Sequence, residues 1–372
     1  MADEVRQDRH PHFPILSRLS SAVAVFTLQY LAAPTLWYRD WFHPPEIPPD
    51  IVKTYPCRPS LPIRIFFPKS YDPKTSQTLP TLFSIHGGGF CLGRPNDDDV
   101  WNARFASMHD MLVIAVNYRK APAYPFPTAM YDSEAIILAA FEDESLPIDK
   151  TRIAIAGFSA GGCLSLGVSQ LPSIREKVKP SAALPVYAVV DHSIPEEIKI
   201  TTRHYKPGLG TGVRAELSDY LTKLSPFFQW SSLSPGFNLK DHRLSPYFAP
   251  HDTLPPHIFF VGAELDQLAH ETWCMANKMA GRPEPAFTDK VGQEKPSAEM
   301  GQLILDDERY AFDHVHEDGK RSVRWLLVPD QVHGFDRLPP EWHGKESLED
   351  AKLKEVAYQE ILGKWLREVV WK

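Results

Sequence analysis

One serine flanked by glycines stands out among the residues that could do chemistry in this chain of 372 residues. It lies in the motif G-x-S-x-G, read here as GFSAG at 157–161, between the apolar run RIAIA and a segment of helical character. In a turn from strand to helix, this motif lifts the serine hydroxyl above a sheet edge, and its glycines avoid side-chain collisions. The helix N-terminus adds partial positive charge beside any oxyanion that forms there. The motif predicts Ser159 as a nucleophile.

A second glycine-rich motif, HGGGF at 86–90, follows the apolar run TLFSI. Consecutive glycines bare backbone N–H groups that can face a substrate oxygen, as in an oxyanion-binding loop. A phosphate-binding loop is not indicated, because no lysine follows in the Walker arrangement.

A nucleophilic serine also needs a base in hydrogen-bond reach and a carboxylate that orients the base. In chains with this serine motif, the acid and then the histidine follow the serine. Asp266 comes just after the apolar run HIFFV and is preferred over its neighbour Glu264, while His333 comes just after the run SVRWLLV. These residues could form one site only if the runs are adjacent strands.

The pattern of the chain supports such strands. Short, almost wholly apolar runs alternate with helical segments, which is typical of a parallel sheet covered on both faces. The predicted strands are 61–68, 81–85, 111–117, 152–156, 182–190, 257–261 and 322–328. The predicted helices are 131–141, 160–170 and 348–369, the last with Leu353, Val356, Ile361, Leu362, Trp365 and Leu366 on its apolar side.

Two long stretches interrupt this alternation. Residues 193–250 are irregular and aromatic, and residues 281–320 are polar and charged. Long irregular stretches inside a compact domain are usually functional or disordered. We predict a lid for the first stretch and a surface insertion for the second.

The N-terminal region leaves two alternatives. Residues 19–38 carry no charge and are just long enough to span a bilayer. The apolar positions Leu16, Leu19, Val23, Phe26 and Tyr30 instead recur at helical spacing, which favours one buried face of a helix. We predict the partly buried helix, and membrane association through 19–38 is the alternative.

Composition narrows the function classes. A net charge of −7 argues against broad binding to nucleic acid. The hydrophobic share of 43% provides a sizeable core. The four cysteines show no metal-binding spacing and are expected to be reduced thiols of an intracellular, cytoplasmic protein. No metal and no cofactor is expected.

Five segments carry a family resemblance: HGGGF at 86–90, NYRKAPAYPFPTAMYD at 117–132, DKTRIAIAGFSAGG at 149–162, the Asp266 segment HIFFVGAELDQL at 257–268 and VHGFD at 332–336. With these, the chain resembles the hormone-sensitive-lipase-like group of carboxylesterases. The resemblance implies an α/β-hydrolase fold, with a mostly parallel central sheet flanked by helices. It divides the chain into an N-terminal extension with a lid helix at 1–50 and a hydrolase domain at 51–372. The lid would combine the N-terminal segment with residues 193–250.

The resemblance also implies roles for residues. Ser159, Asp266 and His333 would form the catalytic triad. The amides of Gly88, Gly89 and Ala160 would form the oxyanion hole, with Gly87 as a further candidate. His86 would pin the loop, and Phe90 and Phe158 would contact substrate.

Three positions depart from the family pattern. Phe158 replaces an acidic residue, Gln267 replaces a proline, and Ala123 replaces a glutamate. None of them alters the three reacting groups.

These observations predict a serine hydrolase that acts on small to medium apolar or aromatic esters, a small-molecule partner. The alternatives at the same site are a natural-product lactonase or deacetylase, an acyltransferase or a dehydratase. A ligand receptor on the same fold is disfavoured, because such receptors lose the histidine that this chain retains at His333.

Overall fold

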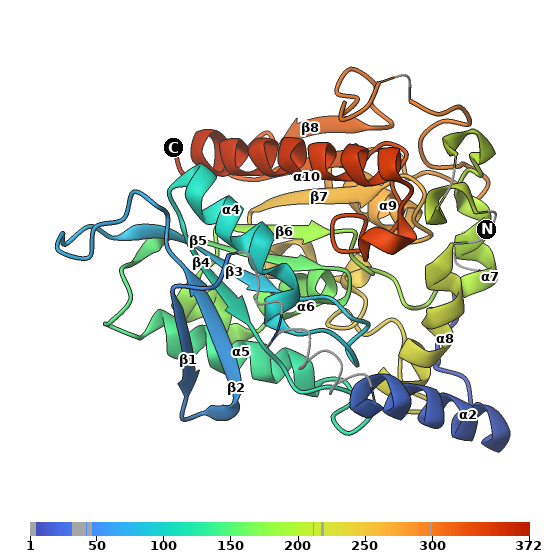
Figure 1. The fold of residues 1–372 in the computed structure, drawn as a ribbon, viewed down its shortest axis with the longest axis horizontal. Helices are drawn as coiled ribbons and strands as arrows, with labels where there is room; N and C mark the ends of the chain where they lie inside the picture. Colours follow the sequence, from blue (N-terminus) through green and yellow to red (C-terminus); the bar gives the residue numbers. More distant parts are fainter. Residues whose placement is uncertain (1–4, 32–41, 43–46, 211, 217–218, 298) are drawn as a thin grey trace.

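A nine-stranded sheet forms the centre of the part of the chain that the computed structural model describes, namely residues 5–31, 42, 47–210, 212–216, 219–297 and 299–372. The strand order is β1-β2-β4-β3-β5-β6-β7-β9-β8 (Figure 1). The strands are β1 (Ile51–Tyr55), β2 (Arg58–Phe66), β3 (Leu79–Ile85), β4 (Leu112–Val116), β5 (Ile148–Phe158), β6 (Ala182–Val186), β7 (His257–Ala263), β8 (Ala311–Val315) and β9 (Ser322–Val328).

The middle of the sheet is parallel and its edges are antiparallel. Strands β4, β3, β5, β6, β7 and β9 all run in one direction. Strand β2 runs against β4, β1 against β2, and β8 against β9. Parallel neighbours bring their carboxyl ends to one edge, so the loops after β3, β5, β7 and β9 meet there.

Helices cover both faces of the sheet (Figure 1). Core contacts place α5, α6 and α9 on one face and α4 and α10 on the other. The helices are α2 (Ile15–Phe26), α4 (Asp99–His109), α5 (Thr128–Phe141), α6 (Ala160–Ser169), α7 (Glu196–Lys199), α8 (Tyr220–Ser232), α9 (Ala269–Met279) and α10 (Lys345–Trp365).

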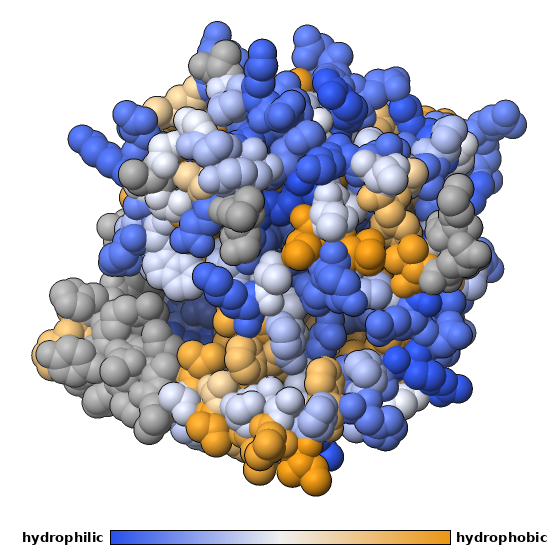
Figure 2. Space-filling view, turned by 90° about the vertical axis from the view of Figure 1, so that its right-hand side faces the viewer, coloured by the Kyte–Doolittle hydropathy of each residue, from blue (hydrophilic) through white to orange (hydrophobic). Residues whose placement is uncertain are grey.

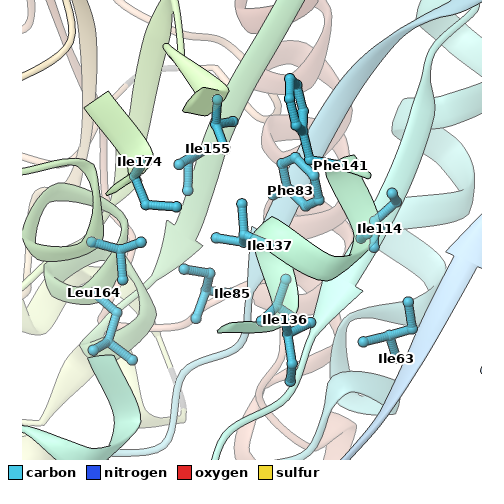
Figure 3. Close-up of a cluster of buried hydrophobic side chains, with 14 of the residues drawn as sticks. Ile63, Phe83, Ile85, Ile114, Ile136, Ile137, Phe141, Ile155, Leu164 and Ile174 are labelled. Carbon is cyan, nitrogen blue, oxygen red and sulfur yellow. The ribbon is translucent and has the colours of Figure 1, made fainter. Parts of the chain in front are cut away.

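Strand β5 shows why the central strands read as continuous apolar runs. Ile153 and Ile155 point into the core beneath α5 and α6, whereas Ala154 and Ala156 point into the core beneath α4 and α10. Side chains alternate along a strand, and a strand covered on both faces buries both sets. Figure 3 shows part of the first core, where Ile155 lies among side chains from β3, β4 and α5.

The structure confirms the predicted α/β-hydrolase architecture. The apolar runs at 81–85, 111–117, 152–156 and 322–328 all form strands of the sheet. The sequence analysis missed the antiparallel edge strands β1 and β8 and the helices α4 and α9. Edge strand β8 lies within the predicted surface insertion at 281–320, so part of that stretch extends the sheet.

The predicted buried face of the N-terminal helix is wrong. Leu16, Leu19 and Val23 are exposed, with 80%, 58% and 66% of their surface accessible, and Phe26 and Tyr30 are exposed as well. The buried residues of α2 are Ser21 and Val25. Figure 2 shows apolar surface at the lower edge of the molecule, where α2 lies.

A helical apolar period shows which side chains share a face, but it does not show which face meets the rest of the protein. Residues 32–38 of the uncharged stretch lie outside the described residues. Within the described residues, the structure has no helix with the length and apolarity that crossing a membrane requires.

The predicted apolar side of the last helix is wrong at two positions. Leu353 and Val356 of α10 are exposed, while Lys354 and Glu355 are buried. The buried charges are paired: Lys354 Nζ lies 2.9 Å from Asp350, and Glu355 lies 2.8 Å from an Arg104 nitrogen. Ion pairing lets charged side chains occupy buried positions that a hydropathy pattern assigns to apolar ones.

The corrected face of α10 can be tested by thermal or denaturant unfolding. Leu362 is fully buried, so Leu362→Ala should lower the free energy of unfolding by about 2–5 kcal/mol. Leu353 is 47% exposed, so Leu353→Ala on the same helix should cost under about 1 kcal/mol. Equal losses would contradict the observed face.

Candidate active site

The turn that carries Ser159 joins β5 to α6 at the carboxyl edge of the sheet. Ser159 has a positive φ of 56°, a strained conformation for a residue with a side chain. A Cβ on Gly161 would lie 2.0 Å from the carbonyl oxygen of Ile85, and a Cβ on Gly157 would lie 2.0 Å from the carbonyl oxygen of Gly161. Only glycine therefore permits the close backbone approach that holds this turn.

The loop after β3 lies directly against this turn. Gly88 and Gly89 have positive φ values of 109° and 58°. A Cβ on Gly87 would lie 3.4 Å from the Cβ of Ser159, so the two loops are in contact. Neither the Gly88 nor the Gly89 amide has an acceptor among the described residues, and the Ala160 amide begins α6, where no intrahelical acceptor exists.

His86 fixes the start of this loop. Its Nδ1 lies 2.7 Å from the Gly87 carbonyl oxygen, and its Nε2 lies 3.1 Å from the Lys120 ammonium. The ring stacks on Tyr118 with 4.3 Å between centroids. Burial, and then the charge of Lys120, hold the pKa of His86 well below its usual value, so the ring is neutral. These contacts agree with the predicted pinning role.

The structure brings Ser159, His333 and Asp266 together in one chain of hydrogen bonds. His333 Nε2 lies 2.8 Å from Ser159 Oγ, and His333 Nδ1 lies 2.7 Å from Asp266 Oδ2. A carboxylate only accepts, so the ring proton lies on Nδ1 and Nε2 accepts from the serine hydroxyl. The other oxygen of Asp266 accepts from the Leu268 amide at 2.9 Å.

Glu264, the competing acid, lies elsewhere. Its carboxylate accepts from the Tyr310 hydroxyl and the Asp330 amide and forms an ion pair with Lys206 at 2.8 Å. It also accepts from the Gln293 amide at 2.8 Å. These contacts join the lid segment, the insertion at 281–320 and the loop before His333 to the end of β7.

The loop that carries His333 is tied to the core on the far side. Asp336 accepts from the hydroxyls of Tyr187 and Tyr358 and pairs with Arg337. Arg337 also pairs with the buried Asp98. Asp336 is the last residue of the VHGFD motif, so the motif supplies both the histidine and its anchor.

The first turn of α8 holds the loops of both Asp266 and His333. Asp219, which caps this helix, accepts from the amides of Leu221 and Gln267 at 2.9 Å each. The Tyr220 hydroxyl donates to the His333 carbonyl at 2.7 Å. Helix α8 belongs to the predicted lid, so part of the lid positions the reacting loops.

The charges around His333 and its burial have opposite effects on its pKa. Burial alone would lower the pKa of His333, but the carboxylates of Asp266, Asp219 and Asp336 outweigh it and raise that pKa above its usual value. Burial, reinforced by the charge of Asp266, raises the pKa of Asp219 to about 6. A protonated, positively charged His333 is therefore stabilised in this site.

Two connected cavities open beside Ser159. The outer cavity, about 250 Å³, reaches His333 and has mostly apolar walls that include Tyr220, Leu224 and Leu338. The inner cavity, about 50 Å³, lies on the Ala160 side of the serine and does not reach His333. Leu221 and Phe228 of α8 line both cavities, so this helix forms part of the wall of each.

The two predicted substrate contacts differ in position. Phe90 lines the inner cavity. Phe158 is fully buried, with the Arg337 guanidinium 3.4 Å from its ring centroid and Trp101 at its edge. Phe158 nevertheless borders the outer cavity, so both predicted residues lie at the cavities beside Ser159.

Sequence reasoning missed Asp219 as a site residue and read Tyr220 only as one aromatic residue of the lid. A helix-capping Asp was the one available signal, and it marks a helix start without revealing which loops that start would touch. No group of His, Cys, Asp and Glu side chains in the described part of the chain could hold a metal ion.

A known protein family matches most of the described hydrolase core. A family model described as alpha/beta hydrolase fold matches residues 82–292, more than half of the chain. The chain therefore belongs to this alpha/beta hydrolase family. Within it, the chain is a hydrolase of the hormone-sensitive-lipase-like, carboxylesterase type.

Curated relatives carry related names. An arylesterase of Saccharolobus solfataricus is 31% identical over 232 residues, which cover 62% of this chain and 70% of the relative. An arylacetamide deacetylase of Oryctolagus cuniculus is 32% identical over 165 residues, only 40% of either chain. A thermostable carboxylesterase from a metagenomic library matches in fold, with a TM-score of 0.60 and 23% identity over 88% of this chain and 91% of that one.

The contact between the two loops can be tested at Gly161. Because its Cβ would lie 2.0 Å from a backbone oxygen of β3, Gly161→Ala should destabilise the protein by several kcal/mol, about 3 or more. Gly208, whose added Cβ has no contact closer than 3.6 Å, provides the control substitution Gly208→Ala. Thermal unfolding of both variants measures the difference, and equal melting temperatures would contradict the close approach.

Proposed function

We propose that Ser159, His333 and Asp266 act as a catalytic triad that hydrolyses carboxylic esters. The observation that carries this proposal is the continuous chain from Ser159 Oγ through His333 to Asp266, with contacts of 2.8 and 2.7 Å, at the floor of an open cavity. A serine hydroxyl gains nucleophilic strength when a neutral histidine accepts its proton in the transition state.

In the first half of the reaction, Ser159 Oγ attacks the ester carbonyl carbon and His333 Nε2 takes the hydroxyl proton. The carbonyl electron pair moves onto oxygen and forms a tetrahedral oxyanion. Collapse of this intermediate breaks the bond to the alcohol, which leaves with the proton from His333. Asp266 keeps the ring in the required tautomer and stabilises the imidazolium.

In the second half, His333 removes a proton from water, which attacks the acyl group on Ser159. The acid product leaves and the serine regains its proton. The amides of Gly88, Gly89 and Ala160, which have no acceptor within the described part of the chain, would hold the oxyanion in both halves. Loss of one such donor costs about 10²–10³ in turnover in comparable enzymes.

The substrate proposed is an ester with a short acyl group and an apolar or aromatic alcohol. The larger outer cavity reaches His333, which protonates the alcohol, and most of its wall surface is apolar, with Tyr220, Leu224 and Leu338 among the side chains that form it. The inner cavity is about five times smaller, at about 50 Å³ against about 250 Å³. The names of the two relatives, an arylesterase and an arylacetamide deacetylase, also support aromatic substrates.

A series of p-nitrophenyl esters tests the proposal. The wild-type protein should hydrolyse acetate to butyrate esters faster than decanoate, because the inner cavity is small. Ser159→Ala should lower kcat/KM by about 10⁴-fold or more. Ser76→Ala, at an exposed serine, is the control and should change nothing. Full activity of Ser159→Ala would remove the proposed triad.

The pH dependence tests the surroundings of His333. The base must be neutral, so kcat/KM should rise with pH through the raised pKa of His333, above the usual value of about 6.5. Asp219→Asn removes one carboxylate that raises this pKa, so the rise should shift to lower pH. Asp318 is exposed in the insertion at 281–320 and is not among the groups that shift the pKa of His333, so Asp318→Asn should leave the profile in place.

An unchanged midpoint in Asp219→Asn would contradict the electrostatic role of Asp219. A profile of Asp219→Asn that keeps its midpoint and only loses amplitude would mean that Asp219 holds the loops in place without acting on the charge of His333.

A further inference from the structure

We propose that the inner cavity binds the acyl part of the substrate and selects a short acyl chain that carries a hydroxyl group. This inference rests on the proposed ester hydrolysis at Ser159 and specifies its substrate. It depends on the position of the inner cavity relative to His333, on its size and on two polar side chains in its wall.

The position of the cavity assigns it to the acyl group. The leaving alcohol must come within reach of His333 Nε2 to receive its proton. His333 and Gly334 line the outer cavity, whereas the inner cavity reaches neither and is bounded by Ala160 and Val189. An ester carbonyl at Ser159 therefore directs its alcohol to the outer cavity and its acyl chain to the inner one.

The size of the cavity limits the length of the acyl chain. One water-sized group needs about 10–15 Å³ by the same measure, so the inner cavity, at about 50 Å³, holds roughly three to five non-hydrogen atoms. A chain of three or four carbons fits, and a long fatty acyl chain does not unless α8 moves.

Several polar side chains line this small space, and two of them, His192 and Glu196, have hydrogen-bonding capacity left for a ligand. His192 lines the cavity, and its Nε2 is buried without a hydrogen-bond partner among the described residues. Glu196 also lines the cavity, where Gln229 and Gln267 each donate to one of its oxygens, at 3.0 and 2.5 Å. Each carboxylate oxygen has two lone pairs, so both oxygens can still accept from a ligand.

These side chains are held in place by the surrounding backbone. The His192 amide donates to Ser245 Oγ at 2.9 Å. The preceding residue, Asp191, pairs with Arg6 at 2.8 Å, and the Lys199 ammonium donates to the Asp191 carbonyl. A buried imidazole nitrogen without a partner costs free energy, and a polar ligand group in the cavity would remove that cost.

A neutral hydroxyl is the ligand group that fits both side chains. Burial, and then the charges of Lys199 and His10, lower the pKa of His192 to about 3, so the ring is neutral and can donate or accept at Nε2. A hydroxyl donates one hydrogen bond and accepts another, so it can donate to the Glu196 carboxylate and accept from His192 Nε2 at the same time. A substrate carboxylate would be repelled by Glu196, and an ammonium would meet the buried Lys199 in the same wall.

The experiment compares p-nitrophenyl 3-hydroxybutyrate with p-nitrophenyl butyrate. The ratio of their kcat/KM values is measured for the wild type, His192→Phe and Glu196→Gln. The intrinsic reactivities of the two esters cancel when ratios are compared between variants. The ratio should fall about tenfold in each variant, because a site built to bind a hydroxyl loses its preference when a partner is removed.

Glu197→Gln provides the matched control. Glu197 is the next residue along, is exposed and does not line the cavity, so its ratio should equal that of the wild type. Glu196→Gln keeps the shape of the side chain, so it carries the test alone if His192→Phe does not fold.

The outcomes distinguish the proposed ester hydrolysis at Ser159 from the proposed selection of a hydroxyacyl group by the inner cavity. Hydrolysis of both esters that depends on Ser159, with the same ratio in all variants, would overturn the hydroxyacyl inference and leave the proposed function standing. Rates that fall equally for both esters would mean that His192 and Glu196 support the site without contacting a substrate hydroxyl, which also overturns the hydroxyacyl inference. No hydrolysis of either ester by the wild type would overturn both.

Discussion

The contact between the backbone of Gly161 and the end of β3 is the constraint on which the rest of the site depends. At this point the first turn of α6 lies so close to the Ile85 carbonyl that no side chain fits between them. The same approach brings the glycine loop at 87–89 against Ser159, and the amides of Gly88 and Gly89 have no acceptor among the residues that the structure describes. The motifs at 86–90 and 157–161, which are far apart in the sequence, therefore form one structural unit. Neither would hold its part of the site, the loop amides or the Ser159 hydroxyl, in position without the other.

The second constraint is electrostatic. His333 is buried, which on its own disfavours the charged ring, yet three carboxylates face it from three different parts of the chain. Asp266 comes from the loop after β7, Asp336 from its own loop and Asp219 from the lid helix. A base that becomes charged during the reaction gains most from such groups when water is excluded, because charges interact more strongly in a medium of low polarity. The lid thus contributes to the charge of the site as well as to its shape.

The parts of the fold and site that could be predicted from sequence are those with a local cause. Strands buried on both faces read as apolar runs, and the two glycine motifs report backbone geometry that other residues cannot adopt. Asp266 and His333 were found because they directly follow such runs. The edge strands β1 and β8 were missed because they are only partly buried and lack that pattern.

The remaining errors concern contacts between distant segments. The exposed apolar face of α2 and the buried charges Lys354 and Glu355 depend on which partner lies opposite, and no spacing within one helix contains that information. The same holds for Asp219 and for Glu196, whose roles arise because the lid segment folds back over the loop at 266–267. Gln267 stands where the family pattern has proline, and a proline could donate neither the amide bond to Asp219 nor the side-chain bond to Glu196. This departure, which leaves Ser159, His333 and Asp266 untouched, therefore joins the acid loop to the wall of the inner cavity. Such departures, and not the shared motifs, reach the cavity to which we assign the acyl group.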